Sequence, residues 1–362
     1  MYFRTFLVIV LAYLSFASTS GQAQSIRMLE AVSGLDEPWG LDFLPDGALI
    51  ITEKDGRVLL WRNGKVTDVK GAPKVADRGQ GGLLDVTVAR DFARSRTLWF
   101  SYSKRQDGGA GTALATARLS QDGTRLEGLR DLFVMSPGSS GGRHFGSRVV
   151  EAPDGKLFIT IGDRADRQEA QNRANHLGTI VRINRDGSVP ADNPFVGQSD
   201  IEPEIWSYGH RNPQGAGLDL KGQLWTAEHG ARGGDEINLI RKGANFGWPV
   251  ISYGKHYSGA KIGEGTAKPG MEQPAMYWDP SMAPSGLLVY SGDMFPEWRG
   301  DLFVGSLKND YISRIEVSGK TAREVARIAN DATERVRDLA QGPDGSIWFI
   351  SVGNGAIYRM VR

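Results

Sequence analysis

The chain has 362 residues with 43 Lys and Arg against 42 Asp and Glu, so its formal net charge is +1 and gives no sign of a nucleic acid or membrane-surface partner. Its 47 glycines are about twice the usual frequency, but only 16 prolines and the lack of a G-x-y period argue against collagen and disorder. No cysteine is present, which excludes disulfide bonds.

The N-terminus carries an unbroken apolar run at residues 6–16, preceded by an arginine and followed by small and polar residues that include Ala23. This run is too short for a transmembrane helix, which needs roughly 20 apolar residues, and it is typical of a secretory signal peptide. We therefore predict a signal peptide at residues 1–23, export to the periplasm or beyond, and a single mature domain at residues 24–362. A buried N-terminal helix or strand is the alternative. No later run is long enough to span a membrane, so we expect no stable membrane insertion.

The rest of the chain repeats one pattern, in which a turn often rich in Asp and Gly joins two short runs of β-branched and aromatic residues. Such a pattern is typical of a β-hairpin. Helical periodicity is nearly absent. Six copies occur, at residues 40–53, 85–103, 148–163, 215–230, 286–307 and 337–353.

Six hairpins in sequence predict an all-β fold, a six-bladed β-propeller of four-stranded antiparallel blades. A two-sheet sandwich repeated twice is the alternative fold. The high glycine content suits a propeller, because every blade needs tight turns. Closure of the ring would bring the loops between blades together at the axial mouth, and we expect the functional site there.

Three clusters of polar residues are candidates for that site. His144 lies between glycines that would let a ligand approach closely, although an exposed turn histidine is the alternative. Arg211, Asn212 and Gln214 surround a proline before the fourth hairpin. Arginine offers a planar fork for carboxylates, and asparagine offers both a donor and an acceptor.

The stretch at residues 225–249 places Glu228, Asp235 and Glu236 in a glycine-rich loop. Carboxylates and free loop carbonyls are hard oxygen ligands that suit Ca²⁺, but a solvated acidic loop would look the same. Near the C-terminus, Arg335 and Arg337 would share one face of an extended strand.

Together with Lys308, which follows an apolar strand, these arginines could clamp a multiply anionic ligand. A surface charge pattern is the alternative for them. Several other functions are disfavoured because no short-spaced histidine pair for zinc, nucleophile elbow, Walker loop or dinucleotide fingerprint stands out. Basic and aromatic residues are not interleaved, which argues against nucleic acid binding.

Six motifs along the chain resemble those of the soluble aldose sugar dehydrogenases that depend on pyrroloquinoline quinone (PQQ), the group that includes soluble glucose dehydrogenase. The resemblance covers nearly all of the mature chain and implies a six-bladed propeller, PQQ at the axial mouth and a Ca²⁺ ion that helps to hold and polarise the quinone. The motifs are GQGGLLDV (79–86), GRHFGSR (142–148), YGHRNPQG (208–215), EHGARGGDEIN (228–238), NFGWP (245–249) and RVRDL (335–339).

The resemblance also implies a role for each matching residue. His144 is expected to be the general base that takes the proton of the sugar C1 hydroxyl while the C1 hydride passes to C5 of PQQ. Asp163 is expected to orient this imidazole or the sugar, and Arg211 to stabilise negative charge on the reduced quinone. The expected cofactor contacts are Gln80, His144, Arg211, Asn212, Tyr257, Lys308, Arg335 and Arg337.

For calcium, the resemblance implies Glu236 and the backbone carbonyl of Phe246 as ligands, and it leaves open whether this ion touches PQQ. The later insertions are shorter than in soluble glucose dehydrogenase, which resembles the broader aldose-oxidising branch. We therefore expect an enzyme that oxidises aldoses to lactones and passes electrons to an external acceptor. A Ca²⁺-dependent lactonase and a non-catalytic sugar- or protein-binding propeller are the alternatives.

Overall fold

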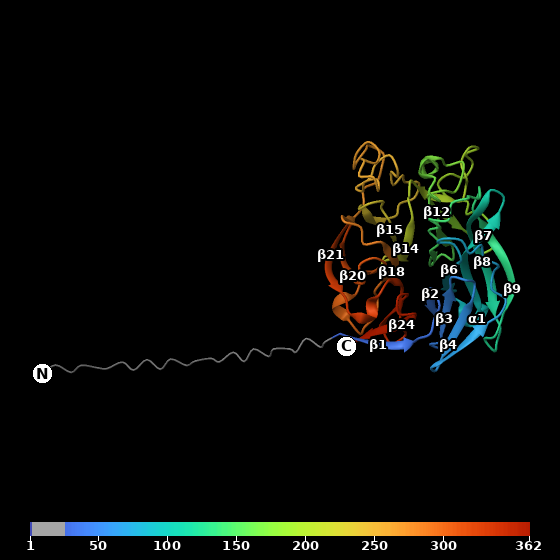
Figure 1. Cartoon of the computed structure of the whole chain (residues 1–362), viewed down its shortest axis with the longest axis vertical. Helices are drawn as coiled ribbons and strands as arrows, with labels where there is room; N and C mark the ends of the chain where they lie inside the picture. The colour runs from blue at the N-terminus through green and yellow to red at the C-terminus, as the bar shows by residue number, and fades with distance from the viewer. Residues whose placement is uncertain (2–25) are drawn as a thin grey trace.

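The structure, a computed structural model, describes Met1 and residues 26–362. These residues form 24 strands in six sheets of four strands each (Figure 1). The signal peptide predicted for residues 1–23 lies outside the described residues apart from Met1. Helical structure in the described part is limited to short segments, namely α1 (Phe92–Ser95) and the 3-10 turns η1 (Arg167–Gln171), η2 (Pro296–Trp298) and η3 (Asp331–Thr333).

Each of the first three blades uses four strands that follow one another in the chain. The first blade contains β2 (Pro38–Phe43), β3 (Leu49–Glu53), β4 (Val58–Arg62) and β5 (Lys65–Val69). The second contains β6 (Leu83–Val88), β7 (Thr97–Gln106), β8 (Gly109–Leu119) and β9 (Leu126–Val134). The third contains β10 (Val149–Glu151), β11 (Leu157–Thr160), β12 (Thr179–Ile183) and β13 (Ile205–Tyr208).

The fourth and fifth blades follow the same rule, whereas the sixth blade combines both ends of the chain. The fourth contains β14 (Pro213–Leu218), β15 (Leu224–Glu228), β16 (Asp235–Leu239) and β17 (Met276–Trp278). The fifth contains β18 (Pro284–Val289), β19 (Leu302–Ser306), β20 (Ile312–Ser318) and β21 (Thr321–Ile328). The sixth contains β22 (Val336–Gln341), β23 (Ile347–Ser351), β24 (Ala356–Val361) and the N-terminal strand β1 (Arg27–Val32).

All six sequence repeats coincide with the first two strands of a blade, as predicted. The turn between β2 and β3 shows the local cause. There the Asp46 carboxylate accepts the N–H of Ala48 at 3.1 Å, and Gly47 adopts a φ of +83° that residues with a side chain rarely tolerate. A turn of this chemistry folds the chain back on itself and sets the register of the hairpin.

The first strand of each blade is innermost, and these six strands form a closed ring. β2 contacts β6 and β22, β10 contacts β6 and β14, and β18 contacts β14 and β22. The six-bladed propeller is therefore confirmed, and the alternative of two sandwiches is wrong. The second strand of each blade packs between neighbouring blades, so strands such as β3 and β23 are buried on both faces and mostly apolar.

The ring is closed by pairing between the first and last strands, β1 and β24, which lie side by side in Figure 1. Strand β1 runs antiparallel to β24, with Arg27 opposite Val361 and Met28 opposite Met360. The long connection between β16 and β17, yellow to orange in Figure 1, projects from one end of the molecule. Among residues 26–362, no helix has the length and apolar character needed to cross a membrane.

Candidate active site in the axial cleft

Two adjoining cavities of about 710 and 830 Å³ form one cleft at the end of the ring where the chain enters the innermost strands. They share Gln80, His229, Ala283 and Lys308. Segments from separate blades meet here, because loops between blades converge wherever a ring of strands closes. All eight residues expected to contact the cofactor line this cleft: Gln80, His144, Arg211, Asn212, Tyr257, Lys308, Arg335 and Arg337.

His144 has an unusual backbone conformation that fixes its position in the cleft wall. Its φ of +56° lies in the left-handed region, and its N–H donates to the Gln80 side-chain oxygen at 2.7 Å. Gly162 makes this position possible, because a Cβ there would lie 2.1 Å from the His144 carbonyl oxygen. The glycines around His144 thus serve close approach between backbone segments as well as access to the cleft.

The imidazole of His144 is held by Asp163, which is buried beneath it. His144 Nδ1 lies 2.6 Å from one oxygen of Asp163, which also accepts the N–H of Ala165 at 2.8 Å. The other oxygen accepts the indole N–H of Trp248 at 2.8 Å. Because these neighbours make Asp163 an acceptor, Nδ1 carries the imidazole proton and the lone pair of Nε2 is left free.

Burial of His144 lowers the pKa of its imidazole, the nearby Arg211 guanidinium lowers it further, and only the interactions with Asp163 oppose these effects. The imidazole is therefore neutral near pH 7 and its Nε2 can accept a proton. Sequence analysis expected Asp163 to orient either this imidazole or the sugar, and the geometry places it against the imidazole.

Arg211 and Asn212 lie where the chain enters β14. The Arg211 backbone N–H donates to Glu228, and its guanidinium donates to the His229 carbonyl oxygen at 3.3 Å and stacks over the Trp248 ring. The Asn212 side-chain oxygen accepts the N–H of Gly146 at 3.0 Å, which ties the loop of His144 to the fourth blade. Trp248 consequently contacts both the partner of His144 and the neighbouring guanidinium.

Six cations line the cleft without an ion-pair partner among residues 26–362, namely Arg211, Arg232, Lys255, Lys308, Arg335 and Arg337. Arg337 donates to the Gln214 side-chain oxygen at 2.8 Å, and Arg335 donates to the Leu307 carbonyl at 3.0 Å. Lys308 and Arg211 likewise donate to backbone carbonyls. Burial, together with the charges of Arg335 and Arg148, lowers the pKa of Arg337 to about 10. Positive charge that the fold itself leaves unpaired attracts an anionic ligand.

His229 also lines the cleft, and sequence analysis did not single it out. Burial and the charges of Arg211 and Arg337 lower its pKa to about 3, so the ring is neutral. Its Nε2 is buried and has no hydrogen-bond partner within the described residues. The motif EHGARGGDEIN contains His229, but only its acidic residues drew attention. Gln214 was noticed only as a member of a polar cluster, and it proves to hold Arg337.

Glu228, Asp235 and Glu236 lie at the ends of β15 and β16 rather than within the loop where sequence analysis placed them. Glu228 accepts hydrogen bonds from His210 and from the Arg211 backbone. Asp235 accepts backbone N–H groups at Gly230 and near β18. Both carboxylates therefore hold the fold together, and Glu236 is the least engaged of the three.

Glu236, Phe246 and Glu228 line a small cavity of about 20 Å³ next to the cleft. Among the described residues, the hydrogen bond of the Glu236 carboxylate comes from the Asn238 side chain at 3.1 Å. Burial, together with the charges of Glu228 and Asp235, raises the pKa of Glu236 to about 8. A cation beside Glu236 would offset both the burial of its carboxylate and the repulsion from Glu228 and Asp235. The residues present therefore fit a metal ion.

Tyr257 differs from the other cleft residues because its side chain is 73% exposed. It lies on the long connection between β16 and β17, at the rim of the cleft beside Lys255 and Gly259. It can therefore touch a ligand only from the open side.

Comparison with known proteins bears on these residues. The model of the glucose/sorbosone dehydrogenase family matches residues 35–359. Aldose sugar dehydrogenase YliI of Escherichia coli strain K12 is 42% identical over 359 residues, which cover 97% of this chain and 96% of that protein. The crystal structure of the soluble Escherichia coli aldose sugar dehydrogenase in its apo-form gives a TM-score of 0.90 at 42% identity, covering 93% of this chain and 99% of that one.

Two more distant relatives were found. Quinoprotein glucose dehydrogenase B of Acinetobacter calcoaceticus is 28% identical over 404 residues, covering 88% of this chain and 84% of that protein. The PQQ-bound aldose sugar dehydrogenase of Streptomyces coelicolor gives a TM-score of 0.79 at 24% identity, covering 93% of this chain and 98% of that one, which is a likeness of fold.

The matches span nearly all of the propeller and place it among the sugar-oxidising oxidoreductases that use this fold. Within that class, the chain belongs to the glucose/sorbosone dehydrogenase family. The resemblance seen in the six sequence motifs is thereby confirmed.

Proposed function

We propose that this protein oxidises the anomeric C1 hydroxyl of aldose sugars to lactones with bound PQQ, and passes the electrons to an external acceptor. The observation that carries the proposal is a neutral imidazole, His144, with a free Nε2 in a cleft that also holds six unpaired cations. The names of the Escherichia coli and Acinetobacter relatives support the same substrate class and a quinone cofactor.

The residues of the cleft fit PQQ, which carries three carboxylates and an orthoquinone. Lys308, Arg335 and Arg337 face one lobe together and would pair with carboxylates. The unpartnered Nε2 of His229 is a polar atom that a ligand in the cleft could satisfy. The remaining residues that would hold the cofactor are Gln80, His144, Arg211, Asn212 and Tyr257.

When bound, PQQ supplies a two-electron acceptor for the hydride of the sugar C1. The contribution of His144 is to accept the C1 hydroxyl proton on Nε2, so that the electrons of the O–H bond form the C1 carbonyl as the hydride leaves. Asp163 holds the imidazole in the tautomer that this step requires and stabilises the imidazolium that forms. Arg211 would stabilise negative charge that develops at the cofactor.

We also propose that Glu236 and the carbonyl of Phe246 bind Ca²⁺. Both line the small cavity beside the cleft, and both supply the hard oxygen ligands that Ca²⁺ prefers. The raised pKa of Glu236 supports this assignment, because a cation would favour its ionised form. Export to the periplasm, with cleavage near Ala23, is part of the same proposal and rests on the N-terminal sequence.

The test is reconstitution of the purified protein with PQQ and Ca²⁺, followed by a panel of aldoses with an artificial dye acceptor. We expect dye reduction only when PQQ, Ca²⁺ and an aldose are all present, together with a visible spectrum that changes on addition of sugar. The proposal is wrong if saturating PQQ and Ca²⁺ support no dye reduction with any aldose. Lactone hydrolysis by the PQQ-free protein would instead favour the lactonase alternative.

A further inference from the structure

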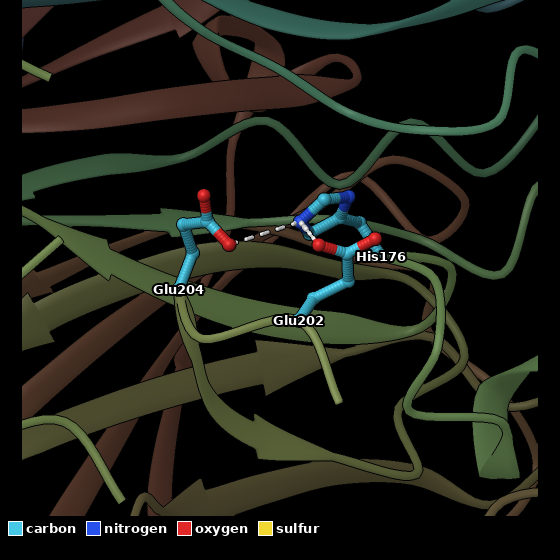
Figure 2. A group of neighbouring side chains, drawn as sticks. All are labelled: His176, Glu202 and Glu204. Carbon is cyan, nitrogen blue, oxygen red and sulfur yellow. Dashed lines mark ion pairs between the residues drawn. The ribbon is translucent and has the colours of Figure 1, made fainter. Parts of the chain in front are cut away.

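A second cluster of metal-ligating side chains lies away from the cleft, near the outer edge of the third blade. Figure 2 shows His176, Glu202 and Glu204 with their functional groups facing one another. His176 lies between η1 and β12, and the two glutamates lie just before β13. One nitrogen of His176 and one oxygen of each carboxylate lie within 4.8 Å of one another.

The imidazole of His176 is fixed from its far side. Its Nδ1 lies 3.0 Å from the backbone N and 3.2 Å from the backbone O of Ser136, and the Phe133 ring packs edge-on against it. The residue is only 4% exposed. The Ser136 N–H donates to Nδ1, so in the metal-free protein Nε2 carries the ring proton and points it at the glutamates. A metal ion at Nε2 would move that proton to Nδ1, where the Ser136 carbonyl at 3.2 Å would accept it.

The polar atoms that face the centre of the cluster have no hydrogen-bond partners. Nε2 of His176 lies 3.6 Å from Glu204 Oε2 and 4.0 Å from Glu202 Oε2, which is too far for a hydrogen bond. Both Nε2 and Glu204 Oε2 are buried and unsatisfied within the described residues. A buried donor or acceptor left without a partner is costly, so something that the protein does not itself supply would complete this group.

Charge leads to the same conclusion. Within residues 26–362, the ion pairs of Glu202 and Glu204 are formed with His176, and no Lys or Arg nitrogen lies within 4.0 Å of either carboxylate. Two carboxylates that converge on one imidazole leave negative charge uncompensated. A cation at their centre would balance this charge and bond to the two unsatisfied atoms, His176 Nε2 and Glu204 Oε2, as well as to Glu202.

We infer that His176, Glu202 and Glu204 form a binding site for Zn²⁺, separate from the cleft. One imidazole and two carboxylates are a ligand set that suits Zn²⁺, whereas Ca²⁺ prefers six to eight oxygen ligands. Zn²⁺ bonds of about 2.1 Å require ligand atoms no more than about 4.2 Å apart. Glu202 can make the small adjustment needed because a third of its side chain, 33%, is exposed.

The position of this site indicates a structural role. Through His176 and Ser136, the ion would fasten the segment before β13 to the chain that follows β9, the last strand of the second blade. The bound metal ion would therefore join the outer parts of two adjacent blades. None of the three ligands lines the cleft, so the inference does not depend on the proposed reaction.

The experiment compares metal binding by the chelator-treated full-length mature protein with that of two variants, Glu204→Gln and Glu202→Gln. Asp200→Asn is the matched control, because Asp200 is exposed on the same segment and lies outside the cluster. Zn²⁺ is titrated by calorimetry, bound zinc is counted after dialysis, and the melting temperature is measured with and without Zn²⁺. Zinc bound elsewhere is common to all four proteins and cancels in the comparison.

We expect the wild type and Asp200→Asn to bind one more equivalent of Zn²⁺ than Glu204→Gln, and to melt at higher temperature when Zn²⁺ is added. Each glutamate variant should lose about 10-fold or more in affinity at this site. Equal zinc content and equal melting shifts in Glu204→Gln and Asp200→Asn would overturn the inference, as would equal affinity of the site for Ca²⁺. Glu202→Gln keeps the test decisive if the more buried Glu204→Gln does not fold.

Discussion

The two ends of the propeller axis handle positive charge in opposite ways. At the cleft end, Lys308, Arg335 and Arg337 have no carboxylate partner in the described part of the chain. At the other end, the later residues of the innermost strands line a cavity of about 430 Å³. There Arg148 binds Asp85 at 2.6 Å and Asp338 at 2.9 Å, so the fold itself pairs the charge.

A single aromatic residue lies between the two arrangements. The Trp39 ring is stacked by the guanidinium of Arg148 at 5.0 Å and by that of Arg337 at 5.5 Å. Two arginines with one common neighbour thus have different roles, since Arg148 links three blades while Arg337 is left for a ligand. The comparison shows how to distinguish the two roles. An arginine that has carboxylate partners within the fold is structural, whereas an arginine without them is available to a ligand.

The largest expected effect comes from Arg148→Met. Removal of one partner leaves Asp85 and Asp338 buried without a counter-charge, so we expect a loss of about 3–5 kcal/mol in the free energy of unfolding. Arg337→Met is the matched control and should lose about 1 kcal/mol or less, because it gives up one hydrogen bond to a neutral oxygen. Denaturant unfolding measures both. Equal losses would contradict the distinction between the two ends.

The next effect concerns chemistry at the cleft end. His144→Ala should lower kcat by about 10²-fold or more, because the proton acceptor of the proposed reaction is removed. Dye-coupled turnover at saturating PQQ gives the rate, and spectroscopic titration confirms that PQQ still binds. Unchanged turnover by a variant with bound PQQ would rule out the role of His144 as base.

Arg337→Met should also weaken PQQ binding about 10- to 100-fold, which corresponds to loss of one hydrogen bond between charged groups. Lys54→Met is the control, since Lys54 lines the same lobe but is already paired with Glu37 and Asp77. Equilibrium titration of each protein with PQQ provides the affinities. Equal losses of PQQ affinity in the two variants would contradict the distinction between unpaired and paired cations of the cleft.

The smallest effect is expected at the end of the axis opposite the cleft, where Asp42 lines the same cavity as Arg148. Burial raises the pKa of Asp42 to about 7 from 3.8, so the folded protein holds this proton more tightly than the unfolded chain. The stability that Asp42 contributes is full below about pH 4 and is lost as pH rises through about 7. Relative to Asp42→Asn, the wild type should therefore lose on the order of 1 kcal/mol between pH 5 and pH 8.5. A pH-independent difference in denaturant midpoints would contradict this.

The hairpins and most of the cleft residues could be predicted from sequence because their signals are local. Asp46 and Gly47 specify their own turn, and the glycines around His144 mark a place where backbone segments meet. The fold class followed from the sixfold recurrence of such turns. The roles proposed for the cleft residues rest on the resemblance of their motifs to a known family.

Features that depend on the spatial relation between blades could not be predicted. Arg148 has its partners in the second and sixth blades, and no local pattern links those positions. The unpartnered nitrogen of His229 becomes apparent only when its surroundings are known. His176 and its two glutamates lie on separate segments with no recognisable spacing, so only the folded chain brings them together.

The pairing of β1 with β24 has a consequence for how this protein comes into existence. The Arg27 side chain donates to the carbonyl of Arg362 at 2.9 Å across 335 positions of sequence. Synthesis makes β1 long before its partner β24, so the sixth blade cannot be completed until β24 has been delivered. Contacts of such long sequence separation also slow folding. Assembly of the cleft therefore depends on the last few residues of the chain, although none of them lines it.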